Sequence, residues 1–221
     1  MQSPLPMNRF QNLDVDQALR LIVEGTASET GTGFYNALVK GLAATLNTNG
    51  AWVTEFVEEA NRLRALAFWL NGEFVSDYEY DLPGTPCEPV IREAKLVHIP
   101  DNVAQLFPND PDLKAFGAVS YLGVPLRDGN NEILGHLAIL DSNPLPADPR
   151  LLNFFRIFAV RTAAEHRRLH TEQVSGGLNS YSVALCARLA SQASFPFGMY
   201  RWLFRWVFST RCSSGTGVLP L

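Results

Sequence analysis

A change of hydrophobic period at Gly50 is the feature that most constrains the fold of this chain. Before it, the segment "TGFYNALVKGLAATLNTNG" repeats apolar residues such as Leu38 and Leu42 at helical spacing. After it, "AWVTEFVEE" alternates, so that Trp52 and Phe56 share one side of an extended chain. Because each pattern buries one face of its element, the sequence predicts a helix followed directly by a half-buried β-sheet.

The same two patterns recur along the chain. We expect about six strands in all, and the five after the first are predicted at residues 63–72, 73–82, 95–99, 119–128 and 132–141. Helical patterns occupy residues 13–29, 32–46 and 147–170. This order predicts an α+β fold with an antiparallel sheet. Pro108, Pro111 and Gly117 allow only short helical turns within residues 101–118, and we expect this segment to close a pocket.

Composition excludes several classes of function. The formal net charge is -4 and the isoelectric point is near 5.6, so the chain has no basic field for nucleic acid, and we expect no such partner. No stretch approaches the roughly 18 apolar residues of a membrane span, and the N-terminus lacks a secretory pattern, so we expect a cytoplasmic protein. Three scattered cysteines, at positions 87, 186 and 212, form neither a disulfide framework nor a zinc motif.

Several ordered motifs resemble a known family. These are "YDLPGTPCEPVI", "FPNDPDLKAFGAVSYLGVPLRD", "EILGHLAILDSNPL" and the helix "LLNFFRIFAVRTAAEHRRL". Together they are similar to GAF domains, in particular those of formate-hydrogenlyase-type transcriptional activators and multidomain bacterial sensor kinases. The resemblance implies a ligand-sensing domain of two-component or related signalling. It also implies helices on one face of the sheet, a loop-covered ligand pocket on the other, and a homodimer formed through the first and last helices.

The resemblance also suggests a division of the chain. Residues 1–12 form an N-terminal extension, residues 13–170 the GAF sensory domain, and residues 171–221 an atypical tail. Every acidic residue lies at or before Glu172, and we interpret this abrupt shift as a frameshifted or truncated linker. The alternative is a membrane-surface segment at residues 195–208, but its two arginines give little attraction to lipid, so membrane contact is not expected.

Cys87 is the first candidate site residue, because "TPCE" has the pattern of a helix start. Thr85 is predicted as the N-cap, Pro86 as the first helical residue, and Cys87 and Glu88 as the next two. The helix dipole would lower the pKa of the thiol, whereas burial and Glu88 would raise it. The alternatives are a reactive thiol and a small buried side chain that faces the pocket.

Two histidines and an aromatic set complete the candidates. His98 and His136 lie on predicted strands, where each is either a hydrogen-bonded core residue or a pocket residue. Aromatic side chains near the strands and the irregular segment provide either packing or a surface for a planar or apolar ligand. They are Trp52, Phe68, Trp69, Tyr78, Tyr80, Phe107, Phe116 and Tyr121. We select Cys87, His98, Phe107, Phe116, Tyr121 and His136 as ligand-pocket candidates.

No catalytic residue, metal site or cofactor is assigned from the sequence. His166 and His170 are one helical turn apart, but "EHRRLH" is typical of a solvated face and lacks a metal-binding order. A bilin tether in this family has histidine after its cysteine, whereas Glu88 follows Cys87. Free methionine-sulfoxide reductases use several cysteines, and this domain has only Cys87. The signature of cyclic-nucleotide-binding GAF domains, an Asn-Lys pair followed by a spaced Phe and Asp-Glu, is also absent.

Three hypotheses follow. The leading one is a non-enzymatic, small-molecule-sensing regulatory domain, whose effector is unidentified and whose output domain belongs to a longer signalling chain. The second is a dimerisation or interaction module without a ligand. The third is a thiol-based redox sensor or a methionine-sulfoxide-reductase-like enzyme that uses Cys87.

Overall fold

The computed structural model describes the backbone of residues 15–192 and the side chains of residues 16–172. Contacts divide the chain into two units, Met1–Thr171 and Glu172–Leu221. The aromatic segment 195–208, the N-terminal extension and the side chains of Cys186 and Cys212 lie outside what is described, as does most of the tail for which a frameshift is predicted. No described helix is both long and apolar enough to cross a lipid bilayer.

A seven-stranded antiparallel sheet forms the centre of the first unit, in the order β3-β2-β1-β7-β6-β5, with β4 also paired to β2. The strands are β1 (Gly50–Val57), β2 (Arg62–Leu70), β3 (Glu73–Phe74), β4 (Glu79–Asp81), β5 (Val97–Ile99), β6 (Ser120–Arg127) and β7 (Ile133–Asp141). The predicted α+β class and antiparallel sheet are confirmed. The predicted strand over residues 73–82 is wrong, because Asp77 has a φ of 53° and interrupts it.

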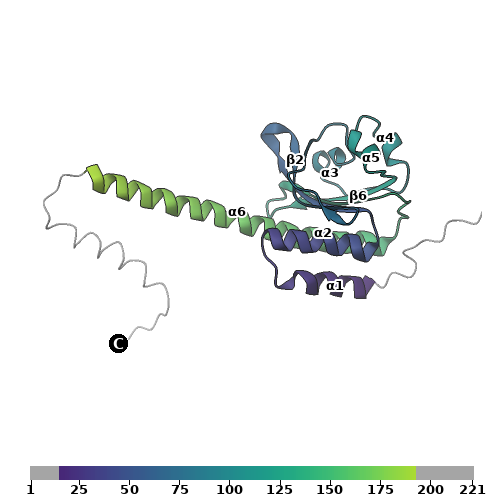
Figure 1. Cartoon of the computed structure of the whole chain (residues 1–221), viewed down its shortest axis with the longest axis horizontal. Coiled ribbons are helices and arrows are strands. Elements are labelled where there is room, and N and C mark those ends of the chain that lie inside the picture. Colours follow the sequence, from purple (N-terminus) through teal and green to yellow (C-terminus); the bar gives the residue numbers. More distant parts are fainter. Residues whose placement is uncertain (1–14, 193–221) are drawn as a thin grey trace, which may run out of the picture. The chain divides into compact units, whose positions relative to one another are not determined.

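Three helices lie on one side of this sheet (Figure 1). α2 (Thr32–Leu46) packs on β1 and β2, and α1 (Val15–Ala27) packs on α2. The first part of α6 (Pro149–Gln192) contributes Phe154, Phe155 and Phe158 to the same core. We call this side of the sheet the helix face. The apolar stripes expected from the helical spacing are buried against it.

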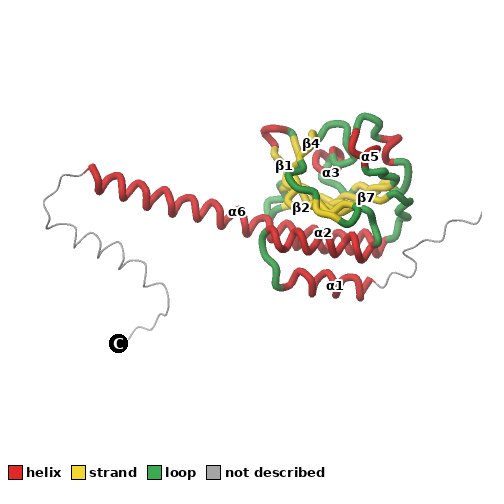
Figure 2. The backbone as a smooth tube through the Cα atoms, viewed as in Figure 1, coloured by secondary structure: helices red, strands yellow, loops and turns green. Residues whose placement is uncertain are grey.

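Short helices and loops cover the opposite side (Figure 2). They are α3 (Glu88–Arg92), α4 (Val103–Leu106) and α5 (Pro111–Ala115), and a 3-10 turn, η1 (Glu58–Ala60), follows β1. The expectation of short helical turns within residues 101–118 is confirmed. This loop face has a second buried cluster, separate from that of the helix face, and Trp52, Phe68 and Tyr121 belong to it.

Two helix boundaries differ from the sequence prediction. α3 begins at Glu88, so Cys87 is its N-cap residue and Thr85 precedes the helix. The Thr85 hydroxyl donates to the Leu82 carbonyl and does not cap α3. α6 continues beyond the predicted end at His170, through two glycines, because glycine weakens a helix by only about 1 kcal/mol per residue and does not forbid it.

Candidate functional site

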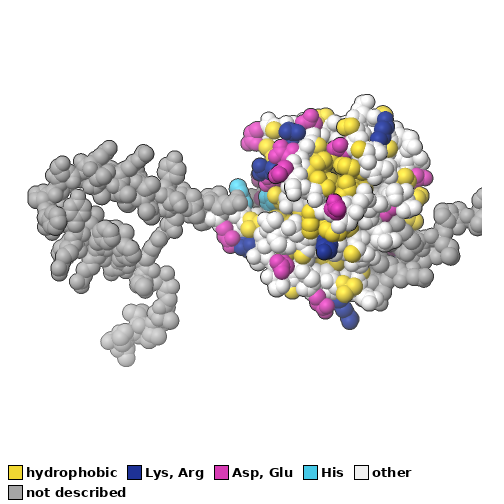
Figure 3. All heavy atoms as spheres, viewed as in Figure 1, with side chains coloured by type: hydrophobic (Ala, Val, Ile, Leu, Met, Phe, Trp, Pro, Cys, Tyr) yellow, Lys and Arg dark blue, Asp and Glu magenta, His cyan; other side chains and the backbone are white. Residues whose placement is uncertain are grey.

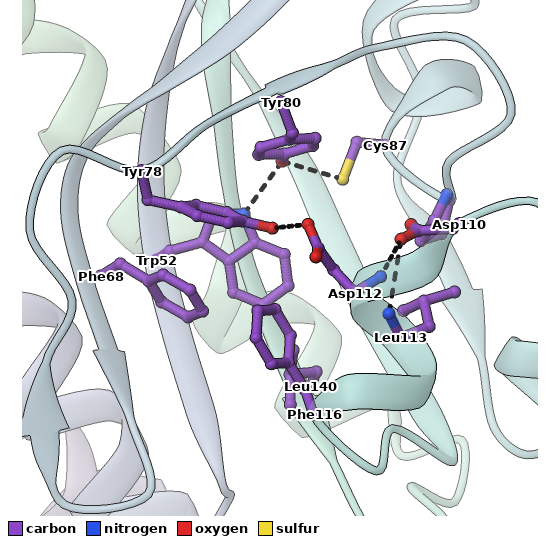
Figure 4. Close-up of a pocket in the computed structure, with 11 residues that line it drawn as sticks. Trp52, Phe68, Tyr78, Tyr80, Cys87, Asp110, Asp112, Leu113, Phe116 and Leu140 are labelled. Carbon is purple, nitrogen blue, oxygen red and sulfur yellow. Dashed lines mark hydrogen bonds between the residues drawn. The ribbon is translucent and has the colours of Figure 1, made fainter.

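A small cavity of about 20 Å³ lies within the loop face, which is room for about one water molecule (Figure 4). The residues that line it are Trp52, Phe68, Tyr78, Tyr80, Pro86, Cys87, Asp110, Asp112, Leu113, Phe116 and Leu140. Five of these carry aromatic rings and two carry carboxylates. Most of the space between the sheet and its covering loops is therefore filled by the side chains themselves.

Strand alternation positions the floor of this pocket. Trp52 of β1, Phe68 of β2 and Leu140 of β7 all point to the loop face, and all three are almost fully buried. The neighbouring residues Ala51 and Val53 point to the helix face. Since successive strand residues alternate between faces, the pattern that identified β1 put Trp52 and Phe56 on one side. The structure shows that this side faces the pocket.

The covering side chains come from the short strand β4 and from loops. Tyr78 precedes β4 and Tyr80 lies within it, and their rings are 5.2 Å apart. Phe116 follows α5, and its ring lies 5.8 Å from Phe68 and 6.1 Å from Tyr78. Tyr78 and Phe116 are half-buried, unlike the floor residues. The pocket thus has a fixed floor on the sheet and a cover made of aromatic side chains from loops.

Cys87 lies between two phenols. Its Sγ atom is 3.2 Å from the Tyr80 hydroxyl and accepts a hydrogen bond from the Tyr121 hydroxyl at 3.4 Å. The Tyr80 hydroxyl also accepts from Trp52 Nε1 at 3.2 Å. Burial raises the pKa of the Cys87 thiol to about 11, and these hydrogen bonds oppose the rise only in part. Cys87 is therefore a neutral, buried thiol at neutral pH.

The two glycines of the "GVPL" and "GHL" motifs have steric roles beside this network. A Cβ atom at Gly123 would overlap the hydroxyl of Tyr121, whose ring lies along the same strand. A Cβ atom at Gly135 would overlap the carbonyl oxygen of Thr54 on the paired strand. The first glycine therefore makes room for the phenol that contacts Cys87, and the second allows β7 to approach β1 closely.

Two carboxylates form the acidic end of the pocket. Asp110 is 8% exposed, and its Oδ1 accepts from the backbone N–H groups of Asp112 at 3.0 Å and Leu113 at 3.4 Å. Burial raises the pKa of the Asp110 carboxyl. The Tyr78 hydroxyl donates to Asp112 Oδ2 at 2.5 Å, and burial with this bond raises the pKa of Tyr78. None of the lining residues is basic.

The six predicted pocket residues have different locations. Cys87 and Phe116 line the cavity. Tyr121 lies beneath it and contacts Cys87, while Phe107 is half-buried at the edge of the same cluster. The His98 ring is hydrogen-bonded, its Nε2 atom lying 2.7 Å from the Leu145 carbonyl oxygen. Phe107, His98, His136 and Tyr121 are not among the cavity's lining residues.

His136 is a core residue of the loop face. Its ring is fully buried, and Nδ1 lies 2.5 Å from the Thr54 hydroxyl oxygen. The rings of His136 and Trp52 are in T-shaped contact, with their centroids 5.9 Å apart. Burial lowers the pKa of His136 to about 3. The imidazole is therefore neutral at physiological pH, and its Nε2 atom has no partner among the described residues.

Sequence reasoning missed the acidic end of the pocket. Asp110 and Asp112 belong to "NDPD", which reads as a helix start, because aspartate before proline is a common N-cap pattern. Other lining residues were also not selected, since apolar and aromatic residues at strand or helix spacing indicate mainly packing. They are Trp52, Phe68, Tyr78, Tyr80, Pro86, Leu113 and Leu140. No local signal separates a capping carboxylate from one that also faces a pocket, because the difference depends on the side chains across the cavity.

A family model described as the GAF domain matches residues 14–165. The chain belongs to the GAF domain family. The resemblance noted in the sequence is thereby confirmed, while the subgroup of transcriptional activators and sensor kinases stays a prediction. GAF domains are in general ligand-binding regulatory or sensory domains. No curated protein matches this chain.

Solved GAF structures share this fold at low sequence identity. The GAF domain of a phosphoenolpyruvate-protein phosphotransferase from Coxiella burnetii has a TM-score of 0.60 and 17% identity, and the match covers 74% of this chain and 97% of that one. The corresponding Acinetobacter domain has a TM-score of 0.59 and 16% identity, with 71% and 95% covered. Free methionine-R-sulfoxide reductase from Neisseria meningitidis, solved with its substrate, has a TM-score of 0.56 and 15% identity, with 72% and 91% covered.

Proposed function

We propose that this GAF domain is a non-catalytic sensor, which binds a small molecule between the sheet floor and the aromatic cover of its loop face. The observation that carries the proposal is the contrast between a buried floor, Trp52 and Phe68, and a half-buried cover, Tyr78 and Phe116. The cavity of about 20 Å³ is the closed form of this pocket. A ligand enters when the cover side chains move.

The contacts that hold the cover are of a kind that a ligand can replace. Tyr78 contacts Phe68 at 5.0 Å and Phe116 at 6.1 Å between ring centroids. Such ring pairs contribute about 0.5 to 1.5 kcal/mol each beyond the area that they bury. An apolar ligand that takes the place of one ring restores most of that contact, so opening requires little net free energy.

A connection from the pocket to α6 runs through β1. Trp52 of β1 lies in the pocket floor, and Glu55 of the same strand contacts His166 of α6, with Oε2 3.7 Å from Nε2. The contacts of Glu55 with His166 and Arg64 lower the pKa of the Glu55 carboxyl, which therefore stays charged. A ligand regulates α6 through this strand if it binds one arrangement of β1 more tightly than the other.

Native mass spectrometry of the full chain, purified from its own host, tests the proposal. We expect the wild-type chain to retain a small molecule that denaturation releases. Phe116→Trp should abolish retention, because the larger ring fills a cavity of only about 20 Å³. Phe74→Trp is the matched control, since Phe74 is 45% exposed on β3 and does not line the pocket.

Two outcomes would contradict ligand sensing at this site. One is the absence of any retained molecule in all three chains. The other is a molecule that Phe116→Trp retains as well as Phe74→Trp does, because its binding site would then lie elsewhere.

The thiol-based alternative has less support from the geometry. A neutral, 2% exposed thiol with a raised pKa is a poor nucleophile, since the thiolate is the reactive form. In a Cys186→Ser/Cys212→Ser chain, we expect Cys87 to react with a disulfide reagent at least about a hundredfold more slowly than in urea-unfolded chain. Labelling of folded Cys87 at the unfolded rate would instead favour the redox sensor or reductase.

An association module is the second candidate, because apolar side chains are exposed on the helices. Leu21 of α1 is 56% exposed, and Ile157 and Val160 of α6 are 54% and 73% exposed. The homodimer through the first and last helices stays a prediction. Sedimentation velocity tests it: Val160→Glu should shift a dimer toward monomer, while Leu106→Glu, at a 62% exposed position on α4, should not. A monomeric wild-type chain would remove this candidate.

A further inference from the structure

The charged residues that line the pocket are all acidic. Asp110 and Asp112 both line it, and no lysine, arginine or histidine does. Neither carboxylate forms an ion pair within residues 16–172. Lys114, two residues from Asp112, is exposed and donates to the Pro108 carbonyl at 3.4 Å. The site is therefore acidic without an internal counter-charge.

Asp110 shows that this charge is unusual. Only 8% of the residue is exposed, and Oδ2 receives no hydrogen bond from the described residues, while Oδ1 caps α5. Burying a carboxylate without a positive partner is costly. Capping does not explain the charge, because asparagine caps a helix about as well as aspartate.

The rest of the pocket wall suits a positive charge with an apolar body. In Figure 4 the Tyr78 hydroxyl meets Asp112, and the rings of Phe68 and Phe116 lie beside the Tyr78 ring. The negative face of an aromatic ring attracts cations, and the attraction grows as water is excluded. A hard metal ion fits this wall poorly, because calcium requires six or more oxygen ligands. No described group of three or more acidic, histidine or cysteine residues could hold a metal ion.

We propose that the ligand of this pocket is a small organic cation, in which an ammonium group faces Asp110 and Asp112 and an apolar body replaces the rings of the cover. This inference rests on the proposed sensing function and specifies its ligand class. Asp112 already accepts one hydrogen bond, from Tyr78, and its pairing with an ammonium would leave that bond in place. Oδ2 of Asp110, which has no hydrogen bond from the described residues, would accept a hydrogen bond from a second N–H of the ammonium group.

Matched probes of equal size separate charge from shape. Isothermal titration calorimetry on the full chain compares isobutylammonium with isobutanol and isobutyrate, and 2-phenylethylammonium with 2-phenylethanol and phenylacetate. We expect the cation to bind most tightly in at least one set, by about tenfold or more over its neutral analogue, because hydrogen bonds to charged groups are the strong ones. The anion should bind most weakly.

Two variants assign the charge preference to this site. Asp110→Asn removes the charge and keeps the cap, and Asp112→Asn keeps an acceptor for Tyr78; each should reduce the preference for the cation about tenfold. Asp128→Asn is the control, because Asp128 also accepts backbone N–H groups, from Asn130 and Glu132, but in the turn between β6 and β7. It should leave the preference unchanged.

The possible results distinguish this inference from the proposed function. Equal binding of cation and neutral analogue, tighter binding of the anion, or an undiminished cation preference in both pocket variants would overturn the organic-cation inference and leave ligand sensing standing. Failure of all six probes would also overturn it. Sensing itself would then be decided by whether the host-purified chain retains another molecule that Phe116→Trp excludes.

Discussion

The two faces of the sheet are both buried, but by different chemistry. On the helix face, aliphatic and phenylalanine side chains such as Leu38 and Phe155 pack against one another without exposure. On the loop face, indole, phenol, thiol and carboxylate groups fill the same kind of space and bond to one another. An apolar side chain loses its packing contacts when its neighbour moves away. A polar group can instead exchange one hydrogen-bond partner for another at small net cost in free energy.

This difference indicates which layer holds the fold and which layer can change. The floor of the loop face is part of the sheet, but its cover comes from Tyr78 and Phe116, whose segments have little regular structure. Figure 3 also shows hydrophobic side chains gathered on the visible face above α2, beside scattered charged groups. We therefore expect substitutions on the helix face to change stability and those on the pocket cover to change mainly ligand binding.

The largest expected effect is on the helix face. Phe155→Ala should lower the free energy of unfolding by about 3 to 5 kcal/mol, because it leaves a cavity at a position with no exposure. Phe116→Ala, at a half-buried cover position, should cost about half as much. Urea unfolding followed by circular dichroism measures both. Equal losses would show that the cover is as rigidly packed as the helix face.

An intermediate effect concerns pH and the buried imidazole of the loop face. His136 has a folded pKa of about 3, below its unfolded value of 6.5, so the unfolded chain binds a proton first as the pH falls. This group's contribution to stability is full above pH 6.5 and decreases by about 1.4 kcal/mol per pH unit below it, or about 2 kcal/mol by pH 5.

The His136→Asn chain should lack this part of the acid destabilisation, when unfolding free energies are compared between pH 7 and pH 5. His170→Asn, at an exposed position on α6, is the control. Identical pH slopes in the wild-type and His136→Asn chains would mean that His136 is accessible to protons in the native state.

The smallest expected effect compares two tyrosine hydroxyls. Tyr80→Phe removes the acceptor of Trp52 Nε1 and a partner of Cys87, so unfolding free energy should fall by about 1 kcal/mol. Tyr35 is buried in the helix face, and its hydroxyl has no partner among the described residues. Tyr35→Phe should therefore be neutral or slightly stabilising.

Thermal unfolding of these two variants tests the contrast between the faces directly. If Tyr35→Phe destabilised the chain more than Tyr80→Phe does, the hydrogen-bond network of the loop face would not be the more important one.

Much of the fold follows from local patterns, and the site follows only in part. Helical spacing around Leu38 and alternation around Trp52 correctly predicted neighbouring elements and the shared side of Trp52 and Phe56. The strand predicted through Asp77 was wrong, since a left-handed residue breaks a strand whatever the alternation beside it. Cys87 lines the cavity, and its pKa depends on burial and on phenols from β4 and β6, which no local pattern reveals.

By itself, the sequence determined the kinds of elements, their order and the apolar helix face, because periodicity is a property of neighbouring residues. Only the tertiary structure decided that Tyr78, Cys87, Asp110 and Asp112 share one pocket. These residues come from three separate segments of the chain, which meet because β4 pairs with β2 and the short helices fold over the sheet. Long-range contacts set the burial and hydrogen bonding of such distant segments. Because of those contacts, the α5 cap residue Asp110 and the thiol of Cys87 line the same acidic, aromatic pocket.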